Sequence, residues 1–235
     1  MGGQGTGSMS GIRGMVIAID GPSGAGKSTI ARILADRLRY TYIDTGAMYR
    51  AVGWKAKRDR VDPADENSLE SLCQEIEIDI RHDKQGQRVL VGGVDVSGEI
   101  RTSEMGMLAS AVSRSPAVRA RLLTLQRRLG AGGGVVMDGR DIGTVVLPDA
   151  DLKFFLDASP EERGRRRFRE LQEKGMDVDL ARITEDIRAR DLQDSTREHA
   201  PLRKAPDARY IDSSPMTIEN VVEEMLRTIK AVQDR

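Results

Sequence analysis

Short apolar runs alternate with longer stretches of helical periodicity along most of the chain, a pattern typical of layered α/β proteins. Strands are predicted at residues 15–19, 40–44, 135–138, 152–156 and 208–212. Helices, with apolar residues every three or four positions, are predicted at residues 29–38, 48–60, 65–72, 103–112, 116–129, 160–174, 180–192 and 218–232. Strands that alternate with helices imply a parallel sheet covered on both faces. We therefore expect a three-layer α/β sandwich.

The stretch between residues 76 and 96 interrupts that pattern. Apolar and acidic residues first alternate, a polar turn follows at 83–87, and the next apolar strand turns through Gly92 and Gly93 into another short strand. Such alternation with close turns predicts antiparallel pairing. We expect about residues 62–100 to form a small inserted subdomain with an antiparallel meander, beside a substrate site.

One glycine-rich segment separates the first predicted strand from the first predicted helix. Its sequence from Gly21 to Ser28 fits G-x-x-x-x-G-K-[ST], the phosphate-binding P-loop. The backbone N–H groups of such a loop and of the helix start form a nest for anions. Lys27 is expected to reach the β- and γ-phosphates of a nucleoside triphosphate, and the Ser28 hydroxyl to face Mg²⁺. The expected triphosphate-binding residues are Gly21, Pro22, Ser23, Gly24, Ala25, Gly26, Lys27, Ser28 and Thr29.

Two further polar segments follow predicted strands, whose carboxyl ends border the ligand crevice of a parallel sheet. Thr45 can hydrogen-bond a substrate and Arg50 can clamp a phosphate, although an N-cap threonine and a surface arginine are the commoner explanation of such a pair. Asp138 ends a buried strand like a Walker B acid, which places Mg²⁺ through water. Arg140 and Asp141 follow it, either as a salt-bridged turn or, as a neighbouring P-loop favours, as functional groups.

Arginines are concentrated in the predicted helix at 160–174, among glutamates. A solvated face is the usual explanation of such a helix. A mobile lid over about 160–175 is the alternative, because phosphoryl transfer needs positive donors and the exclusion of water. The candidate lid residues are Arg163, Arg166 and Arg167.

Composition and charge narrow the remaining classes. The 235 residues carry 37 lysines and arginines against 37 acids and only 3% aromatics, which argues against nucleic acid as a partner. The single cysteine, Cys73, allows no internal disulfide and fits a reducing compartment. No apolar run approaches the length of a membrane span. We expect a monomeric cytoplasmic protein with a disordered leader at 1–14, one domain at 15–235 and no membrane partner.

Five segments together resemble those of bacterial cytidylate kinases. They are Ile19–Ser28, Asp44–Arg50, Val96–Arg101, Asp138–Val146 and the arginine–aspartate run at 190–197. Many families share the P-loop, but the Asp-Gly-Arg-Asp and Ser-Gly-Glu-Ile-Arg blocks are much more specific. The resemblance covers nearly the whole chain beyond the leader.

The resemblance implies a P-loop kinase that transfers the γ-phosphoryl group of ATP to CMP or dCMP with Mg²⁺, in pyrimidine nucleotide metabolism. It implies that Lys27, Arg140 and Arg197 are catalytic, and that Thr45 replaces a serine of other members. By position, Arg50, Arg140 and Arg197 would hold the acceptor phosphate, Ser110, Arg119 and Asp141 would read the cytosine edge, and Arg190 and Asp194 would hold the sugar.

A preference for cytosine over uracil can be explained by the hydrogen-bonding groups of the two bases. An arginine and an acid that face one base can donate to the carbonyl of cytosine and accept from its amine, where uracil carries a second carbonyl. Ser110 and Arg119 look like ordinary helix positions and rest on the resemblance alone. Two alternatives stay open at this point: a kinase for another acceptor, such as UMP, AMP or shikimate, and a nucleotide switch or RNA-binding module.

Overall fold

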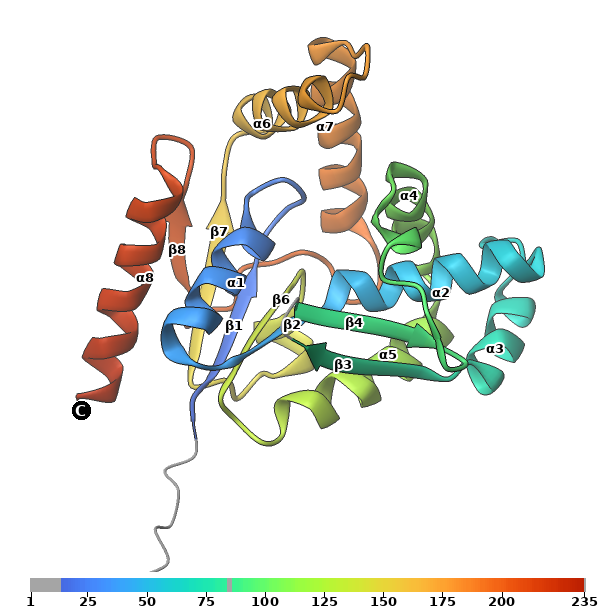
Figure 1. Ribbon diagram of the computed structural model, residues 1–235, viewed down its shortest axis with the longest axis horizontal. Coiled ribbons are helices and arrows are strands. Elements are labelled where there is room, and N and C mark those ends of the chain that lie inside the picture. Colours follow the sequence, from blue (N-terminus) through green and yellow to red (C-terminus); the bar gives the residue numbers. More distant parts are fainter. Residues whose placement is uncertain (1–13, 84–85, 235) are drawn as a thin grey trace, which may run out of the picture.

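A five-stranded parallel sheet forms the centre of the molecule (Figure 1). The computed structural model describes residues 14–83 and 86–234, so the expected leader lies, except for Gly14, outside the described residues. The order is β2-β6-β1-β7-β8, and every neighbouring pair is parallel, which confirms the predicted α/β fold. The strands are β1 (Val16–Asp20), β2 (Thr41–Asp44), β6 (Val135–Gly139), β7 (Leu152–Asp157) and β8 (Arg209–Asp212).

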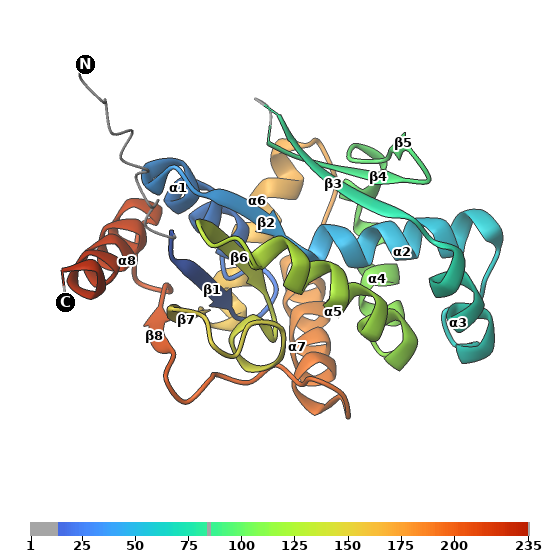
Figure 2. The ribbon, with the colours of Figure 1, turned by 90° about the horizontal axis from the view of Figure 1, so that it is seen from below.

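Alternate residues of β1 enter two separate cores, because successive side chains of a strand point to opposite faces. Ile17 and Ile19 pack with residues of α1 and α8 on one face. Val16 and Ala18 pack with residues of α2 and α5 on the other, and Figure 2 shows the helices on both sides of the sheet. These helices are α1 (Lys27–Leu38), α8 (Ile218–Gln233), α2 (Thr45–Asp59) and α5 (Pro116–Gly130). The P-loop strand is thus held from both sides.

The predicted insertion contains a second, antiparallel sheet in the order β3-β4-β5. The insertion as predicted encloses α3 (Glu66–Glu75), β3 (Ile78–Asp83), β4 (Gly86–Val91) and β5 (Val94–Asp95), ends within the short 3₁₀ helix η1 (Glu99–Arg101) and precedes α4 (Ser103–Val112). Two of its side chains pair with the open edge of β2. His82 Nε2 lies 2.8 Å from the Tyr42 carbonyl oxygen, and the Gln87 amide accepts from Asp44 N at 2.8 Å and donates to Asp44 O at 3.2 Å. These bonds join the meander to the central sheet.

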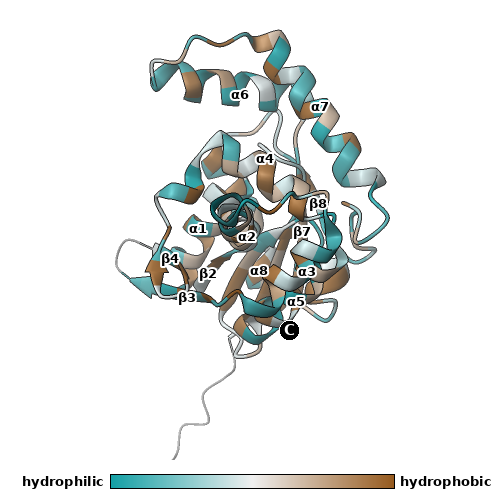
Figure 3. Ribbon diagram, turned by 90° about the vertical axis from the view of Figure 1, so that its right-hand side faces the viewer, coloured by the Kyte–Doolittle hydropathy of each residue, from teal (hydrophilic) through white to brown (hydrophobic). Residues whose placement is uncertain are grey.

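Two helices, α6 (Pro160–Glu173) and α7 (Leu180–Thr196), lie beyond the carboxyl ends of the strands, and their axes cross at a wide angle in Figure 1. Figure 3 shows them projecting from the body of the molecule with mainly hydrophilic residues. The helix predicted at 160–174 is therefore confirmed as α6. Its position beyond the carboxyl ends of the strands is the position that a lid requires.

Two predicted boundaries are wrong for local reasons. The helix predicted from residue 48 begins at Thr45, because the Asp44 carboxylate caps it by accepting from Ala47 N at 3.0 Å. The strand predicted at 76–80 begins only at Ile78, because the Ile76 N–H still donates to Leu72 O at the end of α3.

The segment after β6, predicted as a loop, is a turn of π-helix, η2 (Ile142–Val146). Val146 N donates to Asp141 O at 3.1 Å and Leu147 N to Ile142 O at 2.7 Å. Such wide turns are often found at functional sites. Helix α7, predicted to end at residue 192, continues to Thr196, which places Asp194 on the helix.

Candidate active site

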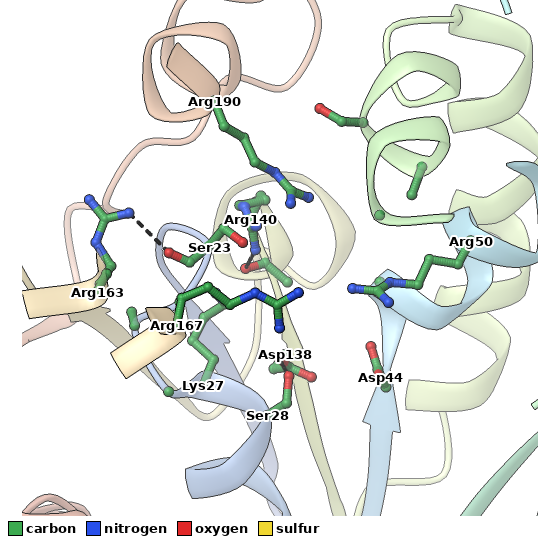
Figure 4. Close-up of a pocket in the computed structure, with 18 of the residues that line it drawn as sticks. Ser23, Lys27, Ser28, Asp44, Arg50, Asp138, Arg140, Arg163, Arg167 and Arg190 are labelled. Carbon is green, nitrogen blue, oxygen red and sulfur yellow. Dashed lines mark hydrogen bonds between the residues drawn. The ribbon is translucent and has the colours of Figure 1, made fainter. Parts of the chain in front are cut away.

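The carboxyl ends of β1, β2 and β6 open into one large cleft beneath α6 and α7 (Figure 4). Its volume of about 1980 Å³ exceeds the roughly 300–1,000 Å³ of a typical single-ligand pocket. Arginines and lysines outnumber carboxylates by about two to one among its lining residues. A chain whose formal charge is zero thus concentrates its positive charge in one place.

The P-loop connects β1 to the start of α1 on one side of the cleft. Gly21, Gly24 and Gly26 have φ angles of 148°, 79° and 92°. A Cβ at Gly21 would lie 1.9 Å from the Leu156 carbonyl oxygen, so no other residue fits there. The Lys27 ammonium donates to Pro22 O at 2.6 Å, and its burial lowers the pKa of Lys27. The loop is therefore preformed around a desolvated cation.

A hydrogen-bonded group surrounds Asp138 at the end of β6, next to the P-loop. The Ser28 hydroxyl donates to Asp138 Oδ2 and the Tyr42 hydroxyl to Asp138 Oδ1, each at 2.9 Å. Burial raises the pKa of Asp138. The Thr45 hydroxyl donates to the Asp138 carbonyl oxygen at 2.7 Å. The helix cap is Asp44, so the N-cap interpretation of Thr45 is wrong.

Four arginines from separate elements meet on the other side of the cleft. Arg50 comes from α2, Arg140 from the end of β6, Arg190 from α7 and Arg197 from the residue after α7. Figure 4 shows Arg50, Arg140 and Arg190 pointing into the same space. Among the described residues, buried Arg190 Nε and Arg197 Nη2 have no hydrogen-bond partner. Burial and the neighbouring cations lower the pKa of Arg190 to about 10. A bound anion would relieve this unfavourable burial of positive charge, so the cluster favours an anionic ligand.

One carboxylate on α7 partly balances that charge. Asp194 Oδ2 accepts from Arg140 Nε at 2.9 Å, and Asp194 Oδ1 lies 3.8 Å from Arg197 Nη1. Burial alone would raise the pKa of Asp194, but the charges of Arg140, Arg190 and Arg197 lower it overall. The arginine cluster is thus held in place with positive charge to spare.

The two residues that only the resemblance indicated, Ser110 and Arg119, line the same cleft as Asp141. Arg119 on α5 forms an ion pair with Asp141, and its Nη1 also donates to Ser113 O at 3.3 Å. Ser110 on α4 accepts from Gln193 Nε2 at 3.1 Å. Arg119 and Asp141, 22 positions apart, therefore present one donor and one acceptor side by side.

The three candidate lid arginines have different surroundings. Arg163 is only 2% exposed, donates to Ser23 O at 2.9 Å and forms an ion pair with Asp191 of α7. Arg166 donates to Ser213 O at 2.7 Å. All three line the cleft, and Figure 4 shows Arg167 extending into it. Arg167 Nη2 also donates to Ser103 Oγ on α4 at 3.0 Å. Arg163 thus joins the start of α6 to the P-loop.

Sequence reasoning missed several residues of the site. Tyr42 and Gln193 contact predicted site residues, but each occupies an unremarkable position on its own strand or helix. No group of three or more acidic, histidine or cysteine residues that could hold a metal ion occurs among the described residues. No helix in the part of the chain that the structure describes is long and apolar enough to cross a membrane.

A P-loop beside a buried acid, facing a separate cluster of arginines, defines a P-loop phosphotransferase with two anion-binding halves. The model of the cytidylate kinase family matches residues 17–231. The chain belongs to the cytidylate kinase family.

Curated relatives named cytidylate kinase match this chain over most of their own length. A cytidylate kinase from Geobacter sp. (strain M21) is 53% identical over 217 residues, which cover 92% of this chain and 93% of that protein. One from Geobacter sulfurreducens is 53% identical over 218 residues, covering 93% and 94%. Among solved structures, a shikimate kinase from Acinetobacter baumannii in complex with shikimate aligns over 93% of this chain and 94% of its own, with a TM-score of 0.47 and 16% identity.

Proposed function

We propose that the two halves of the cleft hold ATP and a cytidine monophosphate for in-line phosphoryl transfer. As a member of its family, the chain is an ATP-dependent kinase that phosphorylates CMP or dCMP, giving CDP or dCDP and ADP. The observation that carries the two-site assignment is the arginine cluster opposite the P-loop, with two buried guanidinium nitrogens that lack partners among the described residues. A second phosphate-bearing ligand would satisfy them.

The donor half would be the P-loop. The backbone N–H groups between Gly21 and Thr29, from every residue except Pro22, would surround the β- and γ-phosphates, and Lys27 would exchange its bond to Pro22 O for a phosphate oxygen. Burial that lowers the pKa of Lys27 is offset once triphosphate charges arrive, which keeps the ammonium protonated.

The Ser28 hydroxyl and the Asp138 carboxylate fit a Mg²⁺ ion. They lie 2.9 Å apart, and Mg²⁺ prefers few protein ligands, with water and phosphate oxygens for the rest. Ser28 would bind the ion directly and Asp138 through water. When bound, Mg²⁺ neutralises charge that develops on the transferred group. Tyr42 would orient Asp138 by its hydrogen bond.

The acceptor half would be built from α2, β6 and α7. Arg50, Arg140 and Arg197 would hold the monophosphate, while Arg190 and Asp194 would hold the sugar. The acceptor nucleophile is then already a phosphate oxygen, so the chemistry asks for position and charge rather than for a general base. Lys27, Arg140 and Arg197 would stabilise the transferred group from its two sides.

The base would lie against Ser110, Arg119 and Asp141. Arg119 can donate to the cytosine carbonyl and Asp141 can accept from the amine. Uracil would put a lone pair against Asp141 and leave that carboxylate unpaired, a contrast that can be worth 10⁴–10⁵ in rate at a well-formed site.

The remaining assignments follow from the same layout. Residues of about 62–100 would be the monophosphate-side subdomain within the kinase domain at 15–235. The lid would be the segment at about 160–175, with Arg167 reaching the phosphates and Arg163 and Arg166 anchoring it to the donor side. We infer a monomer that works in the cytoplasm, in pyrimidine nucleotide metabolism, with small-molecule substrates and no nucleic-acid partner.

A panel of acceptors tests this proposal. CMP, dCMP, UMP, AMP and shikimate are offered with ATP and Mg²⁺, and ADP formation is measured. We expect CMP and dCMP to have the highest kcat/KM, and Mg²⁺ removal to abolish turnover. A preference for UMP, AMP or shikimate would overturn the assignment of the base site.

A further inference from the structure

Asp20 is the residue immediately before the P-loop and has no role in the reaction described above. It ends β1, is 3% exposed, and pairs in register with Gly139 of β6. Its two carboxylate oxygens accept from the backbone N–H groups of Ile142 and Gly143, each at 2.7 Å. A buried acid that binds two consecutive N–H groups this way orients the segment that donates them.

The segment held by Asp20 carries acceptor-site residues. Ile142 and Gly143 begin η2 and directly follow Arg140 and Asp141. A Cβ at Gly143 would lie 3.0 Å from the side chain of Lys153 and 3.4 Å from Asp20 Oδ2, so the turn packs closely against both side chains. The turn therefore has little freedom once Asp20 is bound.

The second segment connected to Asp20 is the P-loop itself, which begins at Gly21. A charge partner for Lys27 would be the simple alternative, since the two charges attract. The Lys27 ammonium, however, donates to Pro22 O, and both Asp20 oxygens are taken by Ile142 and Gly143. The hydrogen bonds thus assign Asp20 to the acceptor turn rather than to the lysine.

We propose that Asp20 is a positioning residue that fixes the positions of Arg140 and Asp141 relative to the P-loop. This one carboxylate thereby aligns the groups that read the base and hold the acceptor phosphate with the bound phosphoryl donor. The proposal rests on the acceptor site proposed above. Asp20 itself touches neither nucleotide; it acts through the turn that it holds.

The first test is Asp20→Asn in the full chain, with steady-state kinetics for CMP, UMP and ATP. The amide keeps the size of the side chain, but its NH₂ group meets one of the two backbone N–H groups as a second donor. We expect KM for CMP to rise by about tenfold and the preference for CMP over UMP to fall by about tenfold, since one hydrogen bond to a charged group is lost. KM for ATP should stay within about twofold.

The matched control is Asp151→Asn. Asp151 Oδ2 accepts from Val16 N at 2.7 Å, the same kind of bond at the opposite end of the same strand. This variant should leave KM for CMP and the base preference unchanged. Thermal unfolding of both variants verifies that they fold, and Asp20→Glu, which keeps both oxygens, should regain part of the base preference if it folds.

A double-mutant cycle decides whether Asp20 acts through Asp141. In an Asp141→Asn background, adding Asp20→Asn should cause no further loss of base preference. An Asp20→Asn enzyme with the parent's KM for CMP and base preference, or one in which all kinetic constants and stability fall together, would overturn the inference. A parent without CMP preference would instead count against the proposed function, so the two failures are distinguishable.

Discussion

Arg140 Nε donates to Asp194 Oδ2 at 2.9 Å, and this ion pair joins residues 54 positions apart. The aspartate side chain is 6% exposed and the arginine 20%, so the pair lies largely out of water. It connects the turn after β6 to α7. The acceptor cluster therefore depends on α7 standing where it does.

Removing that carboxylate should be costly. Asp194→Ala would leave Arg140 beside Arg190 and Arg197 without compensation, and we expect a loss of about 3 kcal/mol in the free energy of unfolding, measured with urea. The exposed pair Arg227–Glu224 provides a control, since Glu224→Ala should cost less than about 1 kcal/mol. Equal losses in the two variants would show that the buried pair contributes no more to the free energy of unfolding than the exposed pair does.

Lys27→Ala should separate catalysis from folding. The ammonium is buried and its pKa is lowered by burial, so its removal relieves a desolvation penalty while it deletes the main cation of the donor half. We expect kcat to fall by about 10²–10³ and the free energy of unfolding to change by less than about 1 kcal/mol. A variant that unfolds much more easily than the parent would contradict this expectation.

Asp141→Ala should damage base recognition specifically. The variant would delete the proposed acceptor for the cytosine amine and remove the ion-pair partner of Arg119, while the P-loop is untouched. We expect kcat/KM for CMP to fall by about 100-fold and the dissociation constant of ATP to stay within about twofold. Turnover of CMP at the parental rate would remove Asp141 from the base site.

Asp20 should also leave a signature in the pH dependence of stability. Burial raises its pKa from 3.8 to about 6, against the effect of the Ile142 and Gly143 N–H groups and of Lys27, and Asp141 raises it further. Between those values the folded protein holds a proton that the unfolded chain has lost. The stability from this proton is fully present below about pH 4 and is lost as the pH rises through about 6.

The Asp20→Asn variant lacks this titration. From about pH 4 to about pH 7, the free energy of unfolding of the parent should fall by about 3 kcal/mol relative to that of the variant, as followed by denaturant curves at each pH. A pH-independent difference in the free energy of unfolding, caused by altered hydrogen bonds in the variant, cancels because only the change with pH is compared. Parallel pH profiles would mean that Asp20 has an ordinary pKa in the fold.

Much of the architecture was predictable because it follows from the local spacing of apolar residues along the chain. The five sheet strands, the meander and the P-loop all lie within a few residues of their predicted positions. The errors at Thr45 and Ile78 come from a capping side chain and one extra helical turn, which the apolar pattern does not record. The π-helical turn at Ile142–Val146 depends on its hydrogen bonds to a distant aspartate, so no local pattern predicts it.

The site was predictable to different degrees on its two sides. Lys27 and Ser28 belong to one contiguous motif, whereas Ser110 and Arg119 had no signal apart from the family resemblance. Tyr42, Gln193 and Asp20 were assigned no role from the sequence. Each acquires its role from a hydrogen bond to a residue 83 to 122 positions away.

The sequence by itself determined the P-loop side of the cleft, the proposed donor half, because a P-loop needs only consecutive backbone N–H groups, three glycines with positive φ and the start of the next helix. The arginine cluster, the proposed acceptor half, was decided by the tertiary structure. Its arginines come from α2, β6 and α7 and converge only when the parallel sheet sets its strand ends side by side. Burial removes these arginines from water and so strengthens their electrostatic attraction for an anion. No single segment of the chain supplies this cluster of charge alone.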